Sequence, residues 1–159
     1  MNPTRHDLPA ETRQTLSNLL NERLADLIDL SLQAKQAHWN VKGSSFIALH
    51  ELFDQVAGFL PAFIDEVGER IVAMGGTAEG TIGVVASRTS LPEYPVDITS
   101  GCDHVDRLAG ALAAAGKRVR ADIGRAADSG DDGTADLLTA LSRELDKYLW
   151  FVEAHLQQK

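Results

Sequence analysis

The sequence predicts an all-α fold: a four-helix bundle with a long crossover between helices two and three and a short extra helix in that crossover. Apolar residues recur at helical spacing in four long segments, and no stretch with the alternation of a β-strand competes with them. A central segment rich in Gly, Thr, Ser and Pro divides the helices into two pairs. The 159 residues suffice for one domain, which we place at 9–159 after a short N-terminal tail, 1–8.

The first helix is expected over about residues 9–41. Asp7 and Pro9 suit its start, and Gly43 suits its end. One face of this helix carries residues spaced three or four apart, namely Leu20, Leu24, Leu27, Ser31, Ala34 and His38. A face of this kind packs against a core.

The second helix is expected to begin at Ser44 or Ser45 and to run to Gly75 and Gly76. This is long for a helix in a globular protein. Pro61 should kink it without ending it, because one proline removes a single backbone hydrogen bond and crowds the preceding turn.

The remaining elements follow from composition. Residues 76–101 form the crossover, with a short helix at about 84–87, and the third helix spans about 103–127. An acidic linker, 128–133, leads to a fourth helix at about 134–156. Four long helices with one long connection between the second and third describe a ferritin-like bundle.

The charge balance favours a protein that handles cations. The net charge is −8, from 15 Lys and Arg against 23 Asp and Glu, which disfavours non-specific binding to nucleic acid. The single cysteine, Cys102, cannot form an internal disulfide, and residues 1–7 lack the apolar segment of a secretory signal. Charge or Gly interrupts each apolar stretch short of the ~18 residues of a membrane span. We therefore expect a cytoplasmic protein with no membrane partner.

Bundles that oxidise iron usually carry Glu-x-x-His pairs on two helices. This chain has five histidines: His6, His38, His50, His104 and His155. The residues three positions before them are Pro3, Lys35, Ile47, Gly101 and Val152. None is a Glu, so the usual site inside one bundle is not predicted.

A different set of ligands lies on the second helix. His50 and Asp54 are four residues apart, and so are Asp65 and Glu69, so each pair lies on one side of the helix. The eleven residues from Asp54 to Asp65 make about three turns, so both pairs point in nearly the same direction. Together they offer an imidazole and three carboxylates, which suit iron or zinc. Along a straight helix, however, Asp54 and Asp65 are about 16 Å apart.

Two geometries could bring the pairs together. The helix could fold back at Pro61, which a lone proline with no adjacent glycine disfavours. Alternatively, a second copy could pack antiparallel across a two-fold axis near Phe59 and Leu60, which gives two equivalent sites in an isologous dimer. We favour the dimer, with His38 as a further ligand beside His50. Each feature also has a structural interpretation, because a histidine that ends an apolar face is commonly a core residue and acidic pairs are commonly solvated.

Two stretches resemble the signatures of the Dps family of mini-ferritins. Residues 38–43, His-Trp-Asn-Val-Lys-Gly, followed by His50 and Asp54, are similar to the first signature. Residues 64–70, Ile-Asp-Glu-Val-Gly-Glu-Arg, are similar to the second. The resemblance covers nearly the whole chain, including Leu91-Pro92, Tyr94-Pro95, Asp97-Ile98 and residues 142–151.

This resemblance implies a hollow homododecamer that acts as a ferroxidase. Such a protein oxidises Fe(II), preferably with hydrogen peroxide, stores ferric mineral in its shell and protects DNA from oxidative damage. The catalytic and metal-binding residues it implies are His38, His50 and Asp54 of one subunit, completed by Asp65 and Glu69 of its neighbour. Two subunits would share each iron site, and zinc is a possible substitute. Trp39, next to His38, could donate electrons that quench radicals or could serve only as an aromatic plug at the helix end.

The acidic linker has two interpretations. In mini-ferritins this region lines a three-fold pore for Fe(II), so the resemblance assigns Asp132 and Asp136 to the pore, with Asp128 or Asp131 next. Aspartates at this place also cap helices and interact favourably with the helix dipole, which we expect of at least one of them.

DNA binding is not expected. Residues 1–8 offer only Arg5 and His6 against Asp7, and the C-terminus adds Lys159. Twelve copies of a chain with net charge −8 would repel duplex DNA. Two alternatives remain: a DNA-condensing shell whose metal site is secondary, and a structural bundle whose dimers are held by zinc.

The other notable side chains receive structural interpretations. We expect His6, His104 and His155 to be exposed or core residues rather than ligands. Trp150 and Phe151 are expected to pack within the bundle.

Overall fold

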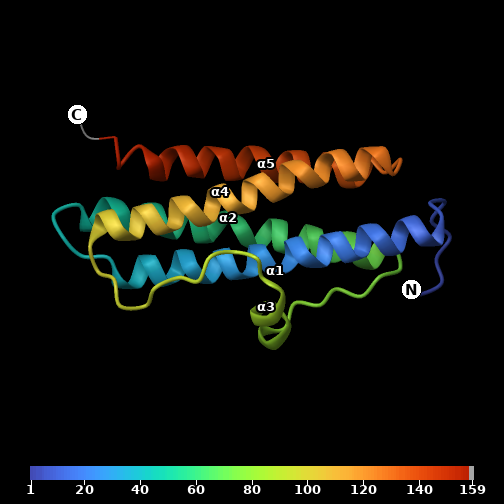
Figure 1. The fold of residues 1–159 in the computed structure, drawn as a ribbon, viewed down its shortest axis with the longest axis horizontal. Helices are drawn as coiled ribbons and strands as arrows, with labels where there is room; N and C mark the ends of the chain where they lie inside the picture. Colours follow the sequence, from blue (N-terminus) through green and yellow to red (C-terminus); the bar gives the residue numbers. More distant parts are fainter. Residues whose placement is uncertain (158–159) are drawn as a thin grey trace.

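The computed structural model describes residues 1–157, so Lys159 lies outside the described residues. Four long helices are present, α1 (Ala10–Asn40), α2 (Phe46–Ala73), α4 (Gly101–Asp128) and α5 (Asp132–Glu153), and the short α3 (Ile82–Arg88) lies in the crossover. α1 packs on α2 and α4 packs on α5, while the crossover runs beside α1 from one end of the bundle to the other (Figure 1). The ferritin-like architecture and the extra helix are therefore confirmed.

The helix boundaries lie within three residues of those predicted, and α2 continues without a break through Pro61. One packing prediction is wrong. Trp150 is 64% exposed, because it lies on the side of α5 opposite to the buried Leu145 and Val152. Phe151 is partly buried and packs against the core.

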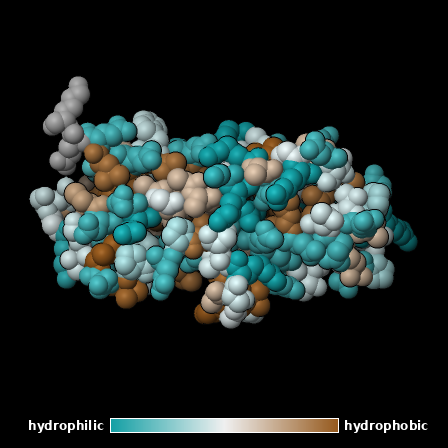
Figure 2. Space-filling view, in the orientation of Figure 1, coloured by the Kyte–Doolittle hydropathy of each residue, from teal (hydrophilic) through white to brown (hydrophobic). Residues whose placement is uncertain are grey.

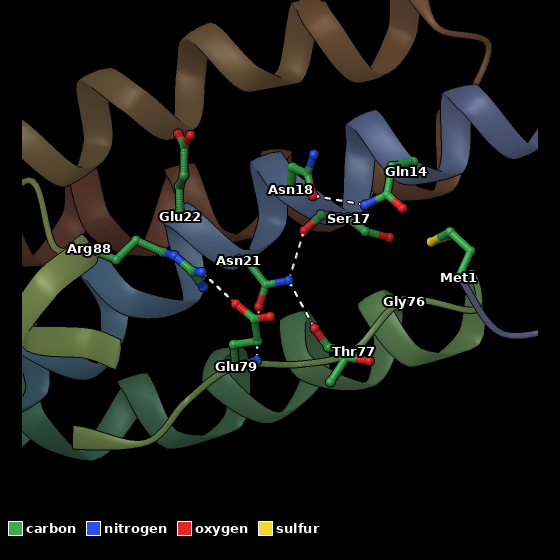
Figure 3. Close-up of a pocket in the computed structure, with 10 residues that line it drawn as sticks. All are labelled: Met1, Gln14, Ser17, Asn18, Asn21, Glu22, Gly76, Thr77, Glu79 and Arg88. Carbon is green, nitrogen blue, oxygen red and sulfur yellow. Dashed lines mark hydrogen bonds and ion pairs between the residues drawn. The ribbon is translucent and has the colours of Figure 1, made fainter. Parts of the chain in front are cut away.

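Polar side chains of α1 fasten the crossover to the bundle. Nδ2 of Asn21 donates to the backbone carbonyl of Thr77 (3.0 Å), and its Oδ1 accepts the backbone N–H of Glu79 (2.9 Å; Figure 3). These groups border a polar hollow of about 300 Å³. Further along α1, the buried carboxylate of Asp26 accepts both the N–H and the hydroxyl of Ser90 (2.8 Å each). The crossover is thus held along its length by hydrogen bonds to one helix.

The turn that ends α2 requires two glycines. Gly75 has φ of +87°, a region that side chains disfavour. A Cβ on Gly76 would lie 2.6 Å from the Ser17 hydroxyl, so no larger residue fits there. The buried guanidinium of Arg13 donates to the carbonyl of Met74 (2.8 Å), which satisfies a backbone group left open at the helix end.

An ion pair joins the end of α2 to the start of α5. Asp131 is the N-cap of α5 and accepts the backbone N–H of Thr134 (3.0 Å). Arg70 donates to Asp131 (2.6 Å) and to the Thr134 hydroxyl (3.0 Å). Burial alone would raise the pKa of Asp131, but the hydrogen bonds from Arg70 and Thr134 outweigh it and hold that pKa below its usual value. The capping expected of one linker aspartate is therefore performed by Asp131, whose side chain is buried.

Replacing Asp131 by Asn should preserve the cap and remove the charge. We expect a loss of about 2 kcal/mol at neutral pH, the value of a hydrogen bond to a charged partner. Because the pKa in the folded state lies below the unfolded value of about 3.9, this contribution is present above that pH and is lost as pH falls through the folded-state pKa. Urea unfolding at several pH values should show the two proteins converging in acid. Asp132→Asn, one residue away and exposed, serves as control, and an equal effect from it would contradict the assignment.

Candidate metal centre

Two histidines face each other at the corner between α1 and α2. His38 lies in the last turn of α1, and His50 lies near the start of α2. Their rings stack with centroids 3.7 Å apart and planes inclined by 21°. Nδ1 of His38 is 2.7 Å from the carbonyl oxygen of His50, and Nδ1 of His50 is 2.8 Å from the carbonyl oxygen of His38. The two residues are thus joined by reciprocal hydrogen bonds.

These hydrogen bonds determine which ring nitrogen can bind a metal. A carbonyl oxygen only accepts, so each Nδ1 carries a hydrogen and donates it. In the neutral ring Nε2 then carries the lone pair that a metal ion needs. The accepting carbonyl of His38 is among the last of α1, which have no partner within the helix. Backbone geometry therefore orients both imidazoles.

Asp54 lies one turn beyond His50 and is exposed. Its carboxylate forms an ion pair with Lys35 of α1. The hydrogen bond from Lys35 holds the pKa of Asp54 below its usual value, and the charge of Lys35 acts in the same direction against partial desolvation. The structure therefore brings His38, His50 and Asp54 into one neighbourhood, with Lys35 beside them.

Asp65 and Glu69 lie elsewhere, on the C-terminal half of α2. Both are exposed and border an open groove of about 920 Å³. The walls of this groove are mostly apolar and include Leu24, Ile28 and Val72. The two carboxylates thus stand at the margin of an apolar surface.

A single chain does not assemble all five predicted ligands. Asp65 follows Asp54 by eleven residues of an unbroken helix, a rise of about 16 Å. Within residues 1–157, no three His, Cys, Asp or Glu side chains lie close enough together to hold a metal ion. His38 and His50 are paired, but Asp54 is turned to Lys35. One chain therefore carries the two parts of the predicted site at separate places, one at the corner between α1 and α2 and the other on the C-terminal half of α2.

The aromatic residue predicted near the site is exposed. The side chain of Trp39 is 66% exposed, although it adjoins His38 in sequence. In the single chain it therefore does not plug the helix end. Phe46 is the aromatic ring that contacts the site, at 5.1 Å from the ring of His50. Of the other histidines, His104 is fully buried and His155 is exposed.

The predicted pore aspartates surround the short turn between α4 and α5. Asp128, Asp132 and Asp136 are all exposed, and Asp132 and Asp136 are one turn apart on α5. In the described part of the chain, none of the three takes part in an ion pair or a side-chain hydrogen bond. Asp131 differs from them because Arg70 and Thr134 occupy its carboxylate.

Lys35 was not predicted as part of this site. A signal was available, because Lys35 is three residues before His38 and so lies on the same face of α1. Spacing along the sequence could not predict that Asp54 is the partner of Lys35, since Asp54 is on another helix.

The chain is similar to known proteins in both sequence and fold. A family model described as ferritin-like domain matches residues 17–159. The chain is 47% identical over 156 residues to a DNA protection during starvation protein of Agrobacterium fabrum, covering 98% of this chain and 96% of that one. The structure of Mycobacterium smegmatis Dps matches with a TM-score of 0.94 at 32% identity, covering 99% of this chain and 95% of that chain. A Vibrio cholerae Dps structure, described as a member of a broad superfamily of ferritin-like diiron-carboxylate proteins, matches with a TM-score of 0.91 at 25% identity, over 99% and 98% of the two chains.

Replacing Lys35 by Met should strengthen binding of a divalent cation at this corner by a few-fold. The change removes both a cation that competes for Asp54 and a repulsive charge. Titration calorimetry with Co²⁺, which binds imidazole and carboxylate ligands, measures the effect. Lys42→Met, an exposed charge on the loop between α1 and α2, is the control. Unchanged affinity in Lys35→Met would show that the ion pair does not restrain Asp54.

Proposed function

The chain belongs to the Dps family of ferritin-like proteins, and we propose that it is a ferroxidase that oxidises Fe(II), preferably with hydrogen peroxide, and stores the ferric product. The shell would be a homododecamer in the cytoplasm, where the free Cys102 remains reduced. By removing iron and peroxide it would protect DNA, in keeping with the name of its relative from Agrobacterium fabrum.

The observation that carries this proposal is the division of the ligands along α2. The imidazoles of His38 and His50 are oriented by bonds through Nδ1, which leaves Nε2 to bind a metal, whereas Asp65 is about four turns of α2 beyond His50, and Glu69 is one turn further. An antiparallel second copy, related by a two-fold axis near the middle of α2, would bring each part to the other. Two complete sites would then form in every dimer.

The exposed surface of α2 supports such a partner. By length and composition α2 is apolar enough to cross a bilayer, yet only 33% of its most apolar 18-residue window is buried in the single chain. Figure 2 shows further apolar residues at the surface over α3 and at the end of the bundle near the C-terminus. Apolar surface of this extent is characteristic of a protein interface. Since Asp65 and Glu69 stand in the groove, we favour a second copy of α2 over lipid as its cover.

The ligand set suits the oxidation of iron. Imidazole and carboxylate together bind Fe(II), and carboxylates stabilise the more highly charged Fe(III). Two Fe(II) ions can reduce one hydrogen peroxide, with two protons, to two water molecules, so that no hydroxyl radical is released. The site contributes by holding the reactants together. Exposed Asp128, Asp132 and Asp136 would concentrate Fe(II) at a three-fold pore.

The direct test adds Fe(II) to the purified protein without oxygen, followed by hydrogen peroxide. Ferric absorbance should rise faster than in a protein-free control, and iron should co-elute with protein at the mass of a dodecamer on a sizing column. Oxidation at the rate of the protein-free control would contradict the ferroxidase proposal.

The double variant Asp65→Asn, Glu69→Gln should leave the shell intact and abolish rapid oxidation, because two of the five ligands lose their charge. Glu66→Gln, exposed on the same helix, is the matched control and should oxidise iron normally. Light scattering and ferric absorbance are measured on the same samples. Dissociation of dimers in the double variant would favour the alternative in which zinc at the interface has a structural role.

DNA condensation is the alternative function within this family, and the charge of the chain argues against it. We expect no shift of duplex DNA in a gel at low salt, because each subunit has net charge −8. A shift at stoichiometric protein that disappears as salt is added would show that the shell binds DNA electrostatically.

A further inference from the structure

A tyrosine of the crossover is hydrogen-bonded to a buried histidine. The crossover passes beside α1 to the end of the bundle where α4 begins (Figure 1). There the hydroxyl of Tyr94 lies 2.7 Å from Nδ1 of His104, and the two rings are nearly parallel, with centroids 6.0 Å apart. Tyr94 is partly buried, and His104 is fully buried. The metal site described above uses neither residue.

The surroundings of His104 affect which groups carry the protons of this hydrogen bond. The backbone carbonyls of Ile98 and Asn40 act on the ring as hydrogen-bond acceptors and so favour a hydrogen on it, although Nε2 has no hydrogen-bond partner within the described residues. A neutral imidazole has a lone pair on one nitrogen, and with that lone pair on Nδ1 the Tyr94 hydroxyl donates to it. Burial lowers the pKa of His104 and keeps the imidazole neutral, and burial likewise raises the pKa of Tyr94. The phenol thus keeps its proton and has a neutral base beside it.

The pair of Tyr94 and His104 lies close to the candidate metal centre, on the core side of α2. The ring of His104 is next to Phe53, with centroids 6.3 Å apart, and Phe53 immediately precedes Asp54 in α2. Asn40, whose carbonyl faces His104, follows His38 by two residues in α1. One layer of residues therefore separates the pair from the candidate ligands His38 and Asp54.

We infer that Tyr94 and His104 form a one-electron, one-proton donor for the metal centre, used when peroxide meets a single Fe(II). This inference rests on the proposed ferroxidase function. A lone Fe(II) supplies only one of the two electrons that cleave the O–O bond safely. A phenol beside a neutral base can supply the other, because its proton can leave together with the electron. Tyr94 is a redox site in this step, and His104 is its proton acceptor.

The step is balanced as follows. Hydrogen peroxide accepts one electron from Fe(II) and one from Tyr94, and with two protons from solvent its O–O bond breaks to give two water molecules. The hydroxyl proton of Tyr94 moves along the 2.7 Å hydrogen bond to Nδ1 of His104. The products are Fe(III), a Tyr94 phenoxyl radical and a protonated His104. The next Fe(II) returns an electron to the radical while His104 returns the proton.

The second tyrosine of the chain provides a matched comparison. Tyr148 stacks on Phe59, with ring centroids 4.5 Å apart, and Lys147 lies over its ring. Within residues 1–157 its hydroxyl has no histidine partner. An oxidised Tyr148 would therefore have no adjacent base for its proton. The sequence contains no other tyrosine, so a tyrosyl signal can be assigned by two single substitutions.

The experiment is freeze-quench electron paramagnetic resonance on the full chain. Protein loaded with one Fe(II) per site receives one equivalent of hydrogen peroxide, and in a second arm metal-free protein is oxidised by a photogenerated ruthenium(III) complex. We expect a tyrosyl radical in the wild type and in Tyr148→Phe, and its loss in Tyr94→Phe. His104→Asn should also lose it, because the amide oxygen can accept the hydrogen bond but cannot hold the proton. A hydroxyl-radical spin trap should gain signal in Tyr94→Phe in the first arm.

The two arms separate this inference from the proposed function. If the wild type does not oxidise iron, the ferroxidase proposal fails, and the metal-free arm still decides whether Tyr94 and His104 act as a pair. If iron is oxidised normally and the tyrosyl signal is absent or persists in Tyr94→Phe, the inference is overturned. A purely structural hydrogen bond between crossover and α4 would give that second result, with normal folding of all variants by circular dichroism.

Discussion

The continuity of α2 is the constraint on which the arrangement of this protein depends. A helix that does not break at Pro61 keeps Asp65 about three turns, and Glu69 about four turns, from Asp54. Within one chain the carboxylates therefore lie far from the imidazoles. The apolar groove beside the carboxylates is open in the single chain, and such a surface is unfavourable in water. One unbroken helix thus both separates the predicted ligands of one chain and carries the uncovered apolar surface.

Hydrogen bonds to backbone carbonyls fix the corner between α1 and α2 that carries His38 and His50. His38 and His50 each bond to the main chain of the other's helix, so the same contacts join α1 to α2 and orient the rings. The N–H of Lys42 donates to the carbonyl of Thr99 (2.9 Å), which ties this corner to the start of α4. Preorganised ligands lose little entropy when a metal binds. The fold therefore orients both predicted imidazole ligands before any ion binds.

Positions along a helix could be predicted from the sequence, whereas relations between helices could not. The buried Leu20, Leu24 and Leu27 follow from their spacing, because one helix repeats its face every three or four residues. The pairing of Lys35 with Asp54 depends on how α1 and α2 are rotated against each other, which spacing does not specify. The prediction that Trp150 packs in the bundle is wrong for a related reason, because apolar character alone does not tell which side of α5 meets the core. The resemblance to Dps proteins supplied the ligand set, and only the structure supplied the orientation of its rings.

The ion pair between Arg70 and Asp131 joins two parts of the chain that carry predicted functional residues. Arg70 directly follows Glu69 in the chain, and Asp131 directly precedes Asp132. The ion pair therefore connects the end of α2 that carries Asp65 and Glu69 to the start of α5, where Asp132 is exposed. A widening of the turn at Asp132 would be opposed by this ion pair, which lies next to Glu69 in the chain. The predicted pore aspartates and the predicted carboxylate ligands of α2 are thus linked within one chain by a single guanidinium.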